Sequence, residues 1–199
     1  MSKIFMTDSE NSARRMHECG QDEYWFYHKG SYPNDTPLLY QELVDNANDE
    51  IIIWDPYFHI KSPDGDQDIF SSIKKDITIK ILTYRGLGRN QQYLIDVKNA
   101  LKTVISPSKD CRFGLRVINK SEPHIQGERF FHDRFLIIDN TDVYLIGSSI
   151  EYHLRSENAI STGIFKVSNN ETKDFIKSIF KYYWDNSAKH EIPLTYLHL

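Results

Sequence analysis

The residues of this sequence best suited to chemistry are a histidine and an arginine two positions apart, His132 and Arg134. They fall in Phe131–Ile138, a β-branched and aromatic run that predicts a strand. Residues i and i+2 of a strand share one face, so the imidazole and the guanidinium could meet a single phosphate. Asp139 follows His132 at an odd offset, which favours an anchoring role for its carboxylate over a reactive one.

Two short segments further along the chain could complete a phosphate site. The first is Gly147-Ser148-Ser149, after a predicted strand over 143–146, where small residues let backbone and hydroxyl groups approach a ligand oxygen. The second contains Glu157 and leads into another predicted strand, over 159–167. Taken alone, His132 is typical of a hydrogen-bonded structural histidine. Its occurrence with Arg134, Ser148 and Glu157 in this order favours phosphate binding.

The elements that must position these residues alternate in the first two thirds of the chain. Helical periodicity precedes a short apolar or β-branched run three times, which predicts an α/β fold with a largely parallel sheet. The expected helices cover 35–48, 67–75 and 90–105, and the expected strands cover 50–55, 77–83 and 112–118. Strands in succession follow, and an amphipathic helix is predicted over 172–184.

Loops that follow the carboxyl ends of parallel strands commonly line the ligand crevice of an α/β sheet. His59 comes after the first predicted strand, and Arg85 and Arg89 come after the second. These three residues are therefore possible pocket-lining side chains. Trp54 and Trp184 are expected in the core. Residues 1–32 have no clear pattern and are assigned to an N-terminal arm, with the domain spanning 33–199.

Composition excludes several classes of protein. The 199 residues carry a formal net charge of −4, which argues against a protein that coats nucleic acid by bulk charge. The two cysteines stand apart from any zinc-ligand spacing, and the calcium-like run at Asp64 lacks the required glycine and glutamate. No metal or cofactor is predicted. Without an apolar span or signal-like start, the sequence suggests a cytoplasmic location.

The segment from His132 to Ala159 resembles the signature of the phospholipase D superfamily, H-x-K-x4-D followed by G-S-x-N. The order of elements over about 35–185 is similar to the small single-motif branch that includes bacterial endonucleases. The resemblance implies a phospholipase D-like mixed β-sheet flanked by helices on both faces, and metal-independent chemistry. It makes His132 the nucleophile of a phosphohistidine, Arg134 the phosphate clamp, Ser148 and Ser149 oxygen ligands, Glu157 the partner of the histidine and Asp139 a structural support.

Two positions depart from that signature. Arg134 stands where the family has lysine, and Ile150 stands where it has the asparagine of G-S-x-N. Arginine keeps the charge but has a different shape, and a lost transition-state donor typically costs about 10²–10³ in rate. A His-x-Arg version, with Asp55-Pro56-Tyr57 after the first strand, also resembles the phospholipase D-like C-terminal domain of MIT-domain proteins, which binds lipid phosphates.

Two functions follow as hypotheses. The first is a phosphodiesterase, a nuclease acting on nucleic acid or another phosphodiester. Because the family needs two histidine motifs and this chain has one, the enzyme is expected to be a homodimer. The alternative is a catalytically degenerate module that binds phosphate groups of nucleic acid or of an anionic membrane surface.

Overall fold

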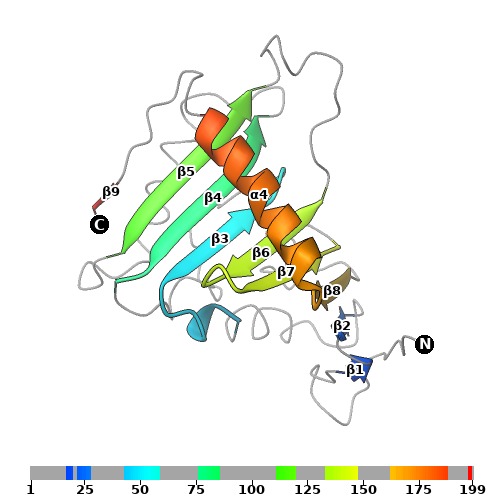
Figure 1. Cartoon of the computed structure of the whole chain (residues 1–199). Helices are drawn as coiled ribbons and strands as arrows, with labels where there is room; N and C mark the ends of the chain where they lie inside the picture. The colour runs from blue at the N-terminus through cyan, green and yellow to red at the C-terminus, as the bar shows by residue number, and fades with distance from the viewer. Residues whose placement is uncertain are drawn as a thin grey trace.

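The described strands form one mixed sheet, and a long helix, α4, crosses one face of it (Figure 1). The computed structural model describes residues 17–19, 22–27, 43–58, 76–85, 111–119, 133–147, 162–187 and 197–198. The sheet has nine strands in the order β1-β2-β8-β7-β6-β3-β4-β5-β9. Their bounds are β1 His17–Cys19, β2 Asp22–Tyr27, β3 Glu50–Trp54, β4 Thr78–Arg85, β5 Arg112–Asn119, β6 Arg134–Ile138, β7 Asp142–Ile146, β8 Thr162–Lys166 and β9 Leu197–His198.

The parallel part of the sheet consists of β3, β4 and β5. Ile53 and Ile81, which face away from the helix, are fully buried. Ile52 and Leu82, on the face toward the helix, are buried as well. Burial on both faces is typical of parallel strands and explains their unbroken apolar runs. The prediction of three parallel strands in this region is confirmed.

The antiparallel part begins where β6 pairs with β3, and it continues through β7 and β8. Residues 139–141 connect β6 to β7, and Asp139 and Asn140 have φ angles of 51° and 53°, a pair of left-handed residues that suits a tight hairpin. The predicted succession of strands is therefore confirmed. Strand β6 begins at Arg134, and residues 131 and 132 of the predicted strand lie outside the described residues.

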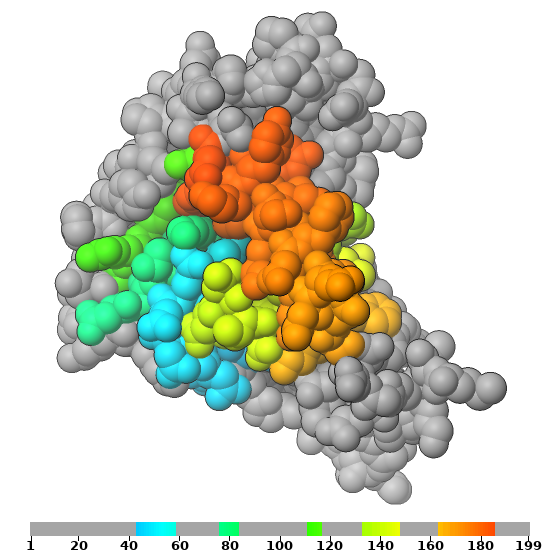
Figure 2. Space-filling model, viewed as in Figure 1, coloured from blue at the N-terminus to red at the C-terminus, as the bar shows by residue number. Residues whose placement is uncertain are grey.

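Helix α4, Asn170–Ser187, lies diagonally across the strands and forms part of the surface in Figure 2. Ile176, Phe180 and Trp184 recur every four residues and pack on a cluster that includes Trp54 and Phe135. The rings of Trp54 and Phe135 lie 5.0 Å apart between centroids. This helix confirms the predicted one, and both tryptophans belong to the core as expected.

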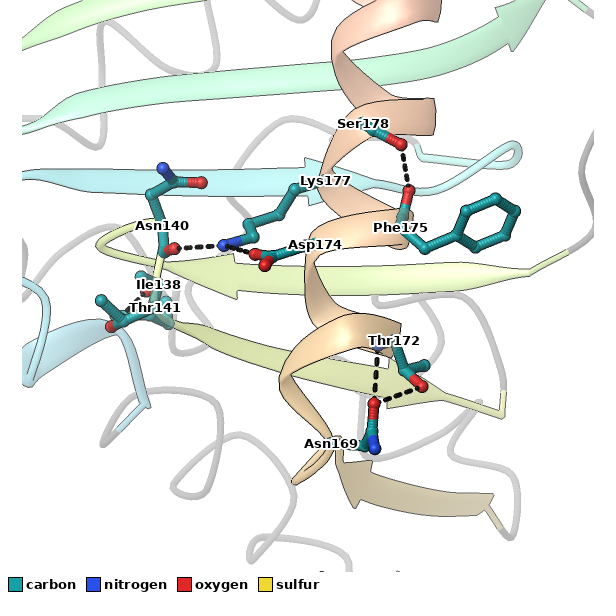
Figure 3. A network of polar contacts seen from close by, with 9 residues as sticks. All are labelled: Ile138, Asn140, Thr141, Asn169, Thr172, Asp174, Phe175, Lys177 and Ser178. Atoms are coloured by element: carbon teal, nitrogen blue, oxygen red, sulfur yellow. Dashed lines mark hydrogen bonds and ion pairs between the residues drawn. The ribbon is translucent and has the colours of Figure 1, made fainter.

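Polar contacts hold the first turns of α4 in place (Figure 3). Asn169 caps the helix, since its Oδ1 accepts the backbone N–H of Thr172 at 2.8 Å. Lys177 pairs with Asp174 at 2.8 Å and donates to the carbonyl of Asn140 at 3.2 Å. The ammonium group thereby connects the helix to the turn between β6 and β7.

The N-terminal stretch, which the sequence left unplaced, contributes β1 and β2, and β2 pairs with β8 in the same sheet. Of the expected helix over 35–48, residues 43–48 are described: 43–45 are helical, whereas 46–48 form a turn and bend, so the helix ends earlier than predicted. The expected helices over 67–75 and 90–105 lie outside the described residues. Within the part of the chain that is described, no helix is long and apolar enough to cross a membrane.

Candidate functional site

Three strand ends meet at one edge of the sheet. Trp54, the last residue of β3, pairs with Leu82 of β4 and with Phe135 of β6. Leu82 and Phe135 belong to the core cluster of α4, so Trp54 and its partners point toward that helix. Because side chains alternate along strands, the next positions on these strands, occupied by Asp55, Thr83 and Arg134, lie on the opposite face.

Arg134 and Asp55 form an ion pair at this edge. The Nε atom of Arg134 lies 3.6 Å from Oδ1 of Asp55. The carboxylate side chain is completely buried, whereas the arginine side chain is 18% exposed. A buried carboxylate requires a nearby positive charge, because removing an unpaired charge from water costs several kcal/mol. The pair therefore orients the guanidinium from its inner side.

Asp55 is itself fixed by a tight turn over residues 55–58. Its backbone N–H donates to the carbonyl of Leu82 at 3.0 Å, which attaches the turn to β4. Its Oδ1 accepts the backbone N–H of Tyr57 at 2.9 Å, and its carbonyl accepts that of Phe58 at 3.2 Å. Pro56 occupies the second position of this turn, where its fixed φ angle is favourable. The carboxylate is thus held in one position before any ligand arrives.

The ring of Tyr57 also lies close to the guanidinium. The Cζ atom of Arg134 lies 5.3 Å from the centroid of the Tyr57 ring, within the range of a cation–π contact. Tyr57 is 41% exposed, in contrast to the buried residues around it. Arg134 therefore contacts both a buried carboxylate and an accessible aromatic ring.

Two glycines face each other beside Arg134. Arg134 pairs with Ile146, the last residue of β7, and the backbone N–H of Gly147 then donates to the carbonyl of Gly163 at 2.9 Å. Neither residue has a side chain, so the backbone at this edge is open to close approach by a ligand. The sequence identified Gly147 but missed Gly163, whose partnership depends on the register of β7 and β8.

Thr83 adds a buried hydroxyl to the same edge. Its side chain is completely buried, and its Oγ1 atom has no hydrogen-bond partner. Leaving such a group unsatisfied costs about 1–3 kcal/mol, which is unusual in a sheet interior. Asp55 and Thr83 are the two buried polar residues in the described part of the chain; Asp55 follows the last residue of β3, and Thr83 lies on the neighbouring strand β4.

Asp139 lies at the other end of β6, away from Arg134. Its carboxylate accepts the backbone N–H groups of Asn48 at 3.0 Å, Asp49 at 2.8 Å and Glu50 at 3.1 Å. Its own N–H donates to the carbonyl of Glu50 at 2.8 Å. The carboxylate thus binds the segment that leads into β3 and the first residue of that strand, which is an anchoring contact.

The pKa of Asp139 is lowered from its ordinary value of 3.8. Partial burial raises the pKa, but the hydrogen bonds from the backbone N–H groups of Asp49, Glu50 and Asn48 outweigh it. The ionised form is therefore favoured in the folded protein. This carboxylate is a permanent acceptor at neutral pH rather than a group prepared to exchange protons.

Several residues that the sequence proposed for the site lie outside the described residues: His132, Ser148, Ser149, Ile150, Glu157, His59 and Arg89. Arg85 is the last residue of β4, at the same edge as Arg134. Arg134 is the first residue of β6, and because His132 lies outside the described residues, the expectation that the two side chains share a strand face stays a prediction. Asp55 and Tyr57, which the sequence did not assign to the site, contact Arg134. The sequence feature that could have indicated these two residues was the Asp-Pro-Tyr run after the first strand.

Within the described ranges, no group of three histidine, cysteine, aspartate or glutamate side chains is arranged to hold a metal ion.

Neither a protein-family model nor a curated protein matches the sequence. Solved structures do match the fold. NucT from Helicobacter pylori has a TM-score of 0.51 and 15% identity, covering 82% of this chain and 96% of its own. Nuc from Salmonella typhimurium, a phospholipase D family member, has a TM-score of 0.50 and 14% identity, with coverage of 82% and 93%.

The phosphatidylserine synthase of Haemophilus influenzae Rd KW20 is also similar, with a TM-score of 0.54 and 18% identity. The match covers 82% of this chain but 37% of the synthase, so the chain spans little more than a third of that protein. At such identities the likeness concerns the fold. The chain therefore has a phospholipase D-like fold, as the sequence predicted.

Proposed function

We propose that this chain is a phospholipase D-like phosphodiesterase that cleaves nucleic acid without a metal, with Arg134 as its phosphate clamp. The observation that carries the proposal is the support of Arg134 at the sheet edge by Asp55 and Tyr57. A guanidinium fixed in orientation can grip two phosphate oxygens with less loss of entropy than a mobile one. The neighbouring glycines, Gly147 and Gly163, give a phosphate access to the backbone.

Covalent geometry supports His132 as the nucleophile. It precedes Arg134 by two positions in the chain, and two residues of chain span at most about 7 Å. The histidine that the family signature assigns to attack is therefore close to the cation that the structure holds in place. Ser148 follows Gly147 directly, which favours its hydroxyl as a further ligand of the phosphate.

The proposed reaction has two balanced steps. In the first, a ring nitrogen of His132 attacks phosphorus and the P–O bond to the leaving strand breaks, so that the leaving oxygen takes a proton from a general acid. In the second, water attacks the phosphohistidine, the P–N bond breaks, and a phosphomonoester and the free imidazole are released. Arg134 neutralises charge on the phosphoryl oxygens in both steps, and Glu157 orients the imidazole.

The general acid is proposed to be His132 of the partner subunit in a symmetric homodimer. The sequence has one candidate motif, and an isologous interface can bring two copies of one side chain together. The imidazole that protonates the leaving oxygen in the first step accepts a proton from water in the second.

The test is cleavage of a labelled oligonucleotide by the full chain in EDTA. Wild type is expected to cleave it, and His132→Asn is expected to abolish cleavage while leaving inorganic phosphate affinity within about tenfold. Arg134→Ala should weaken phosphate binding, because it removes a charge-assisted contact. Cleavage that requires added magnesium, or that survives His132→Asn, would overturn this mechanism.

A second function, phosphate binding without catalysis, is favoured by two specific residues. Arg134 replaces the family lysine, and Ile150 replaces an asparagine that donates to the phosphate. The double variant Arg134→Lys with Ile150→Asn restores the signature. If wild type binds phosphate without cleavage and the double variant gains EDTA-resistant cleavage, the protein is a decayed enzyme that now binds. If wild type cleaves at least as fast as the double variant, the enzymatic proposal stands.

A further inference from the structure

We propose that Tyr57 is a stacking platform for an unpaired base, and that the site therefore selects single-stranded over duplex nucleic acid. This inference rests on the proposed function, in which Arg134 binds a phosphate of nucleic acid. It adds the class of strand that the site accepts and a residue that determines it.

The side chain of Tyr57 is accessible at the protein surface. The described residues of the turn around Tyr57 are buried, whereas Tyr57 is 41% exposed. Phe58, the next residue, is only 2% exposed and supplies the apolar anchor of the turn. The phenol ring is thus presented at the surface by a rigid base rather than required for the core.

The Tyr57 ring lies next to the guanidinium of Arg134. The Arg134 guanidinium lies 5.3 Å from the ring centroid, so the aromatic surface is adjacent to the proposed phosphate clamp. A nucleic acid strand presents a planar base next to each phosphate. Proteins that bind single strands combine a cation for the backbone with an aromatic ring for the base, and each such stack is worth about 1–3 kcal/mol.

A base inside a double helix cannot stack on Tyr57. The faces of bases in a double helix are covered by their neighbours, so a ring beside a phosphate can stack only on a base that has left the helix. Lipid phosphates do not offer a base. The gain from Tyr57 is therefore specific to unpaired strands.

The experiment compares three fluorescent ligands on the full chain: a single-stranded oligonucleotide, the same strand in a duplex, and an abasic strand with the same phosphates. Wild type is expected to prefer the first. Tyr57→Leu should weaken binding of the single strand between about fivefold and 150-fold, with a smaller loss for the abasic strand. Tyr57→Phe keeps the ring and should stay near wild type. Both variants keep the backbone N–H that donates to Asp55, so the turn is retained.

The outcomes are distinguishable. Equal losses on the base-bearing and abasic strands would show that Tyr57 only supports Arg134, and would overturn the inference while leaving the proposed function intact. If the duplex binds as tightly as the single strand, the inference is likewise overturned and the proposed function remains intact. If no strand binds, or if anionic vesicles bind and no strand does, the inference and the nucleic-acid proposal both fail.

Discussion

The carboxylate of Asp139 lies 2.8 Å from the backbone nitrogen of Asp49, although 90 residues separate them in the chain. The same group also accepts the N–H groups of Asn48 and Glu50, so one side chain satisfies three consecutive donors at the start of β3. The left-handed turn of Asp139 and Asn140 aims the carboxylate at them. The end of β6 farthest from the candidate site is therefore anchored to the start of β3.

Replacing Asp139 by asparagine should destabilise the protein by about 1–2 kcal/mol at neutral pH, the range for losing a capping acceptor. Because the pKa of the folded state is lowered, this contribution is present above the unfolded value of 3.8 and is lost as pH falls through the folded value. Urea unfolding from pH 7 to acid should thus show a shallower pH dependence for Asp139→Asn. Asp174→Asn, at an exposed ion pair, is the matched control and should change stability by under about 0.5 kcal/mol.

The hairpin turn makes a prediction for Asn140. Its φ of 53° suits glycine and asparagine, whereas a residue with a β-carbon and no local hydrogen bonding is disfavoured there. Asn140→Ala should lower the free energy of unfolding by about 1–2 kcal/mol, and Asn140→Gly should be neutral or slightly stabilising. Lys177 donates to the backbone carbonyl, which both variants retain. Equal stability of the two variants would contradict the proposed importance of the backbone angle.

The two faces of α4 offer a matched pair of phenylalanines. Phe180 is buried against Trp54 with 6.2 Å between ring centroids, whereas Phe175 is 66% exposed. Phe180→Ala should cost about 3–5 kcal/mol through lost burial and a cavity, and Phe175→Ala should stay within about 0.5 kcal/mol. Thermal or denaturant unfolding measures both. A comparable loss at Phe175 would mean that the exposed face of the helix has a partner.

The Asp55–Arg134 pair should be energetically coupled. Asp55→Asn keeps the acceptor for the Tyr57 N–H but removes the charge, and Arg134→Met removes the cation but keeps much of the volume. A double-mutant cycle on unfolding free energies should give a coupling of about 0.5–3 kcal/mol.

The control for that cycle is the more exposed pair of Lys166 and Asp142, whose charged atoms lie 3.2 Å apart. Its coupling should fall below about 1 kcal/mol despite the shorter distance, because water screens it. Coupling at Asp55–Arg134 no larger than at this control would indicate that the buried pair does not hold the guanidinium.

The sequence by itself determined the order and type of the central elements. Strands β3, β4 and β5 are short apolar or β-branched runs between helical patterns, and α4 repeats apolar residues every three or four positions. Such periodicities record which face of a local element is buried, so they can be recognised without the partner. The same holds for His132 and Arg134 as a pair of chemical groups, since their types and spacing are local properties.

Only the tertiary structure decided what surrounds Arg134. Its contacts with Asp55 and Tyr57 depend on the register that sets Trp54 opposite Phe135, and nothing local to either segment specifies that register. Gly147 contacts Gly163, and β2 lies beside β8, because strands that are far apart in the sequence pair in the sheet. Pairing is chosen by the total burial and hydrogen bonding of the whole sheet, so these neighbours emerge when the chain has folded.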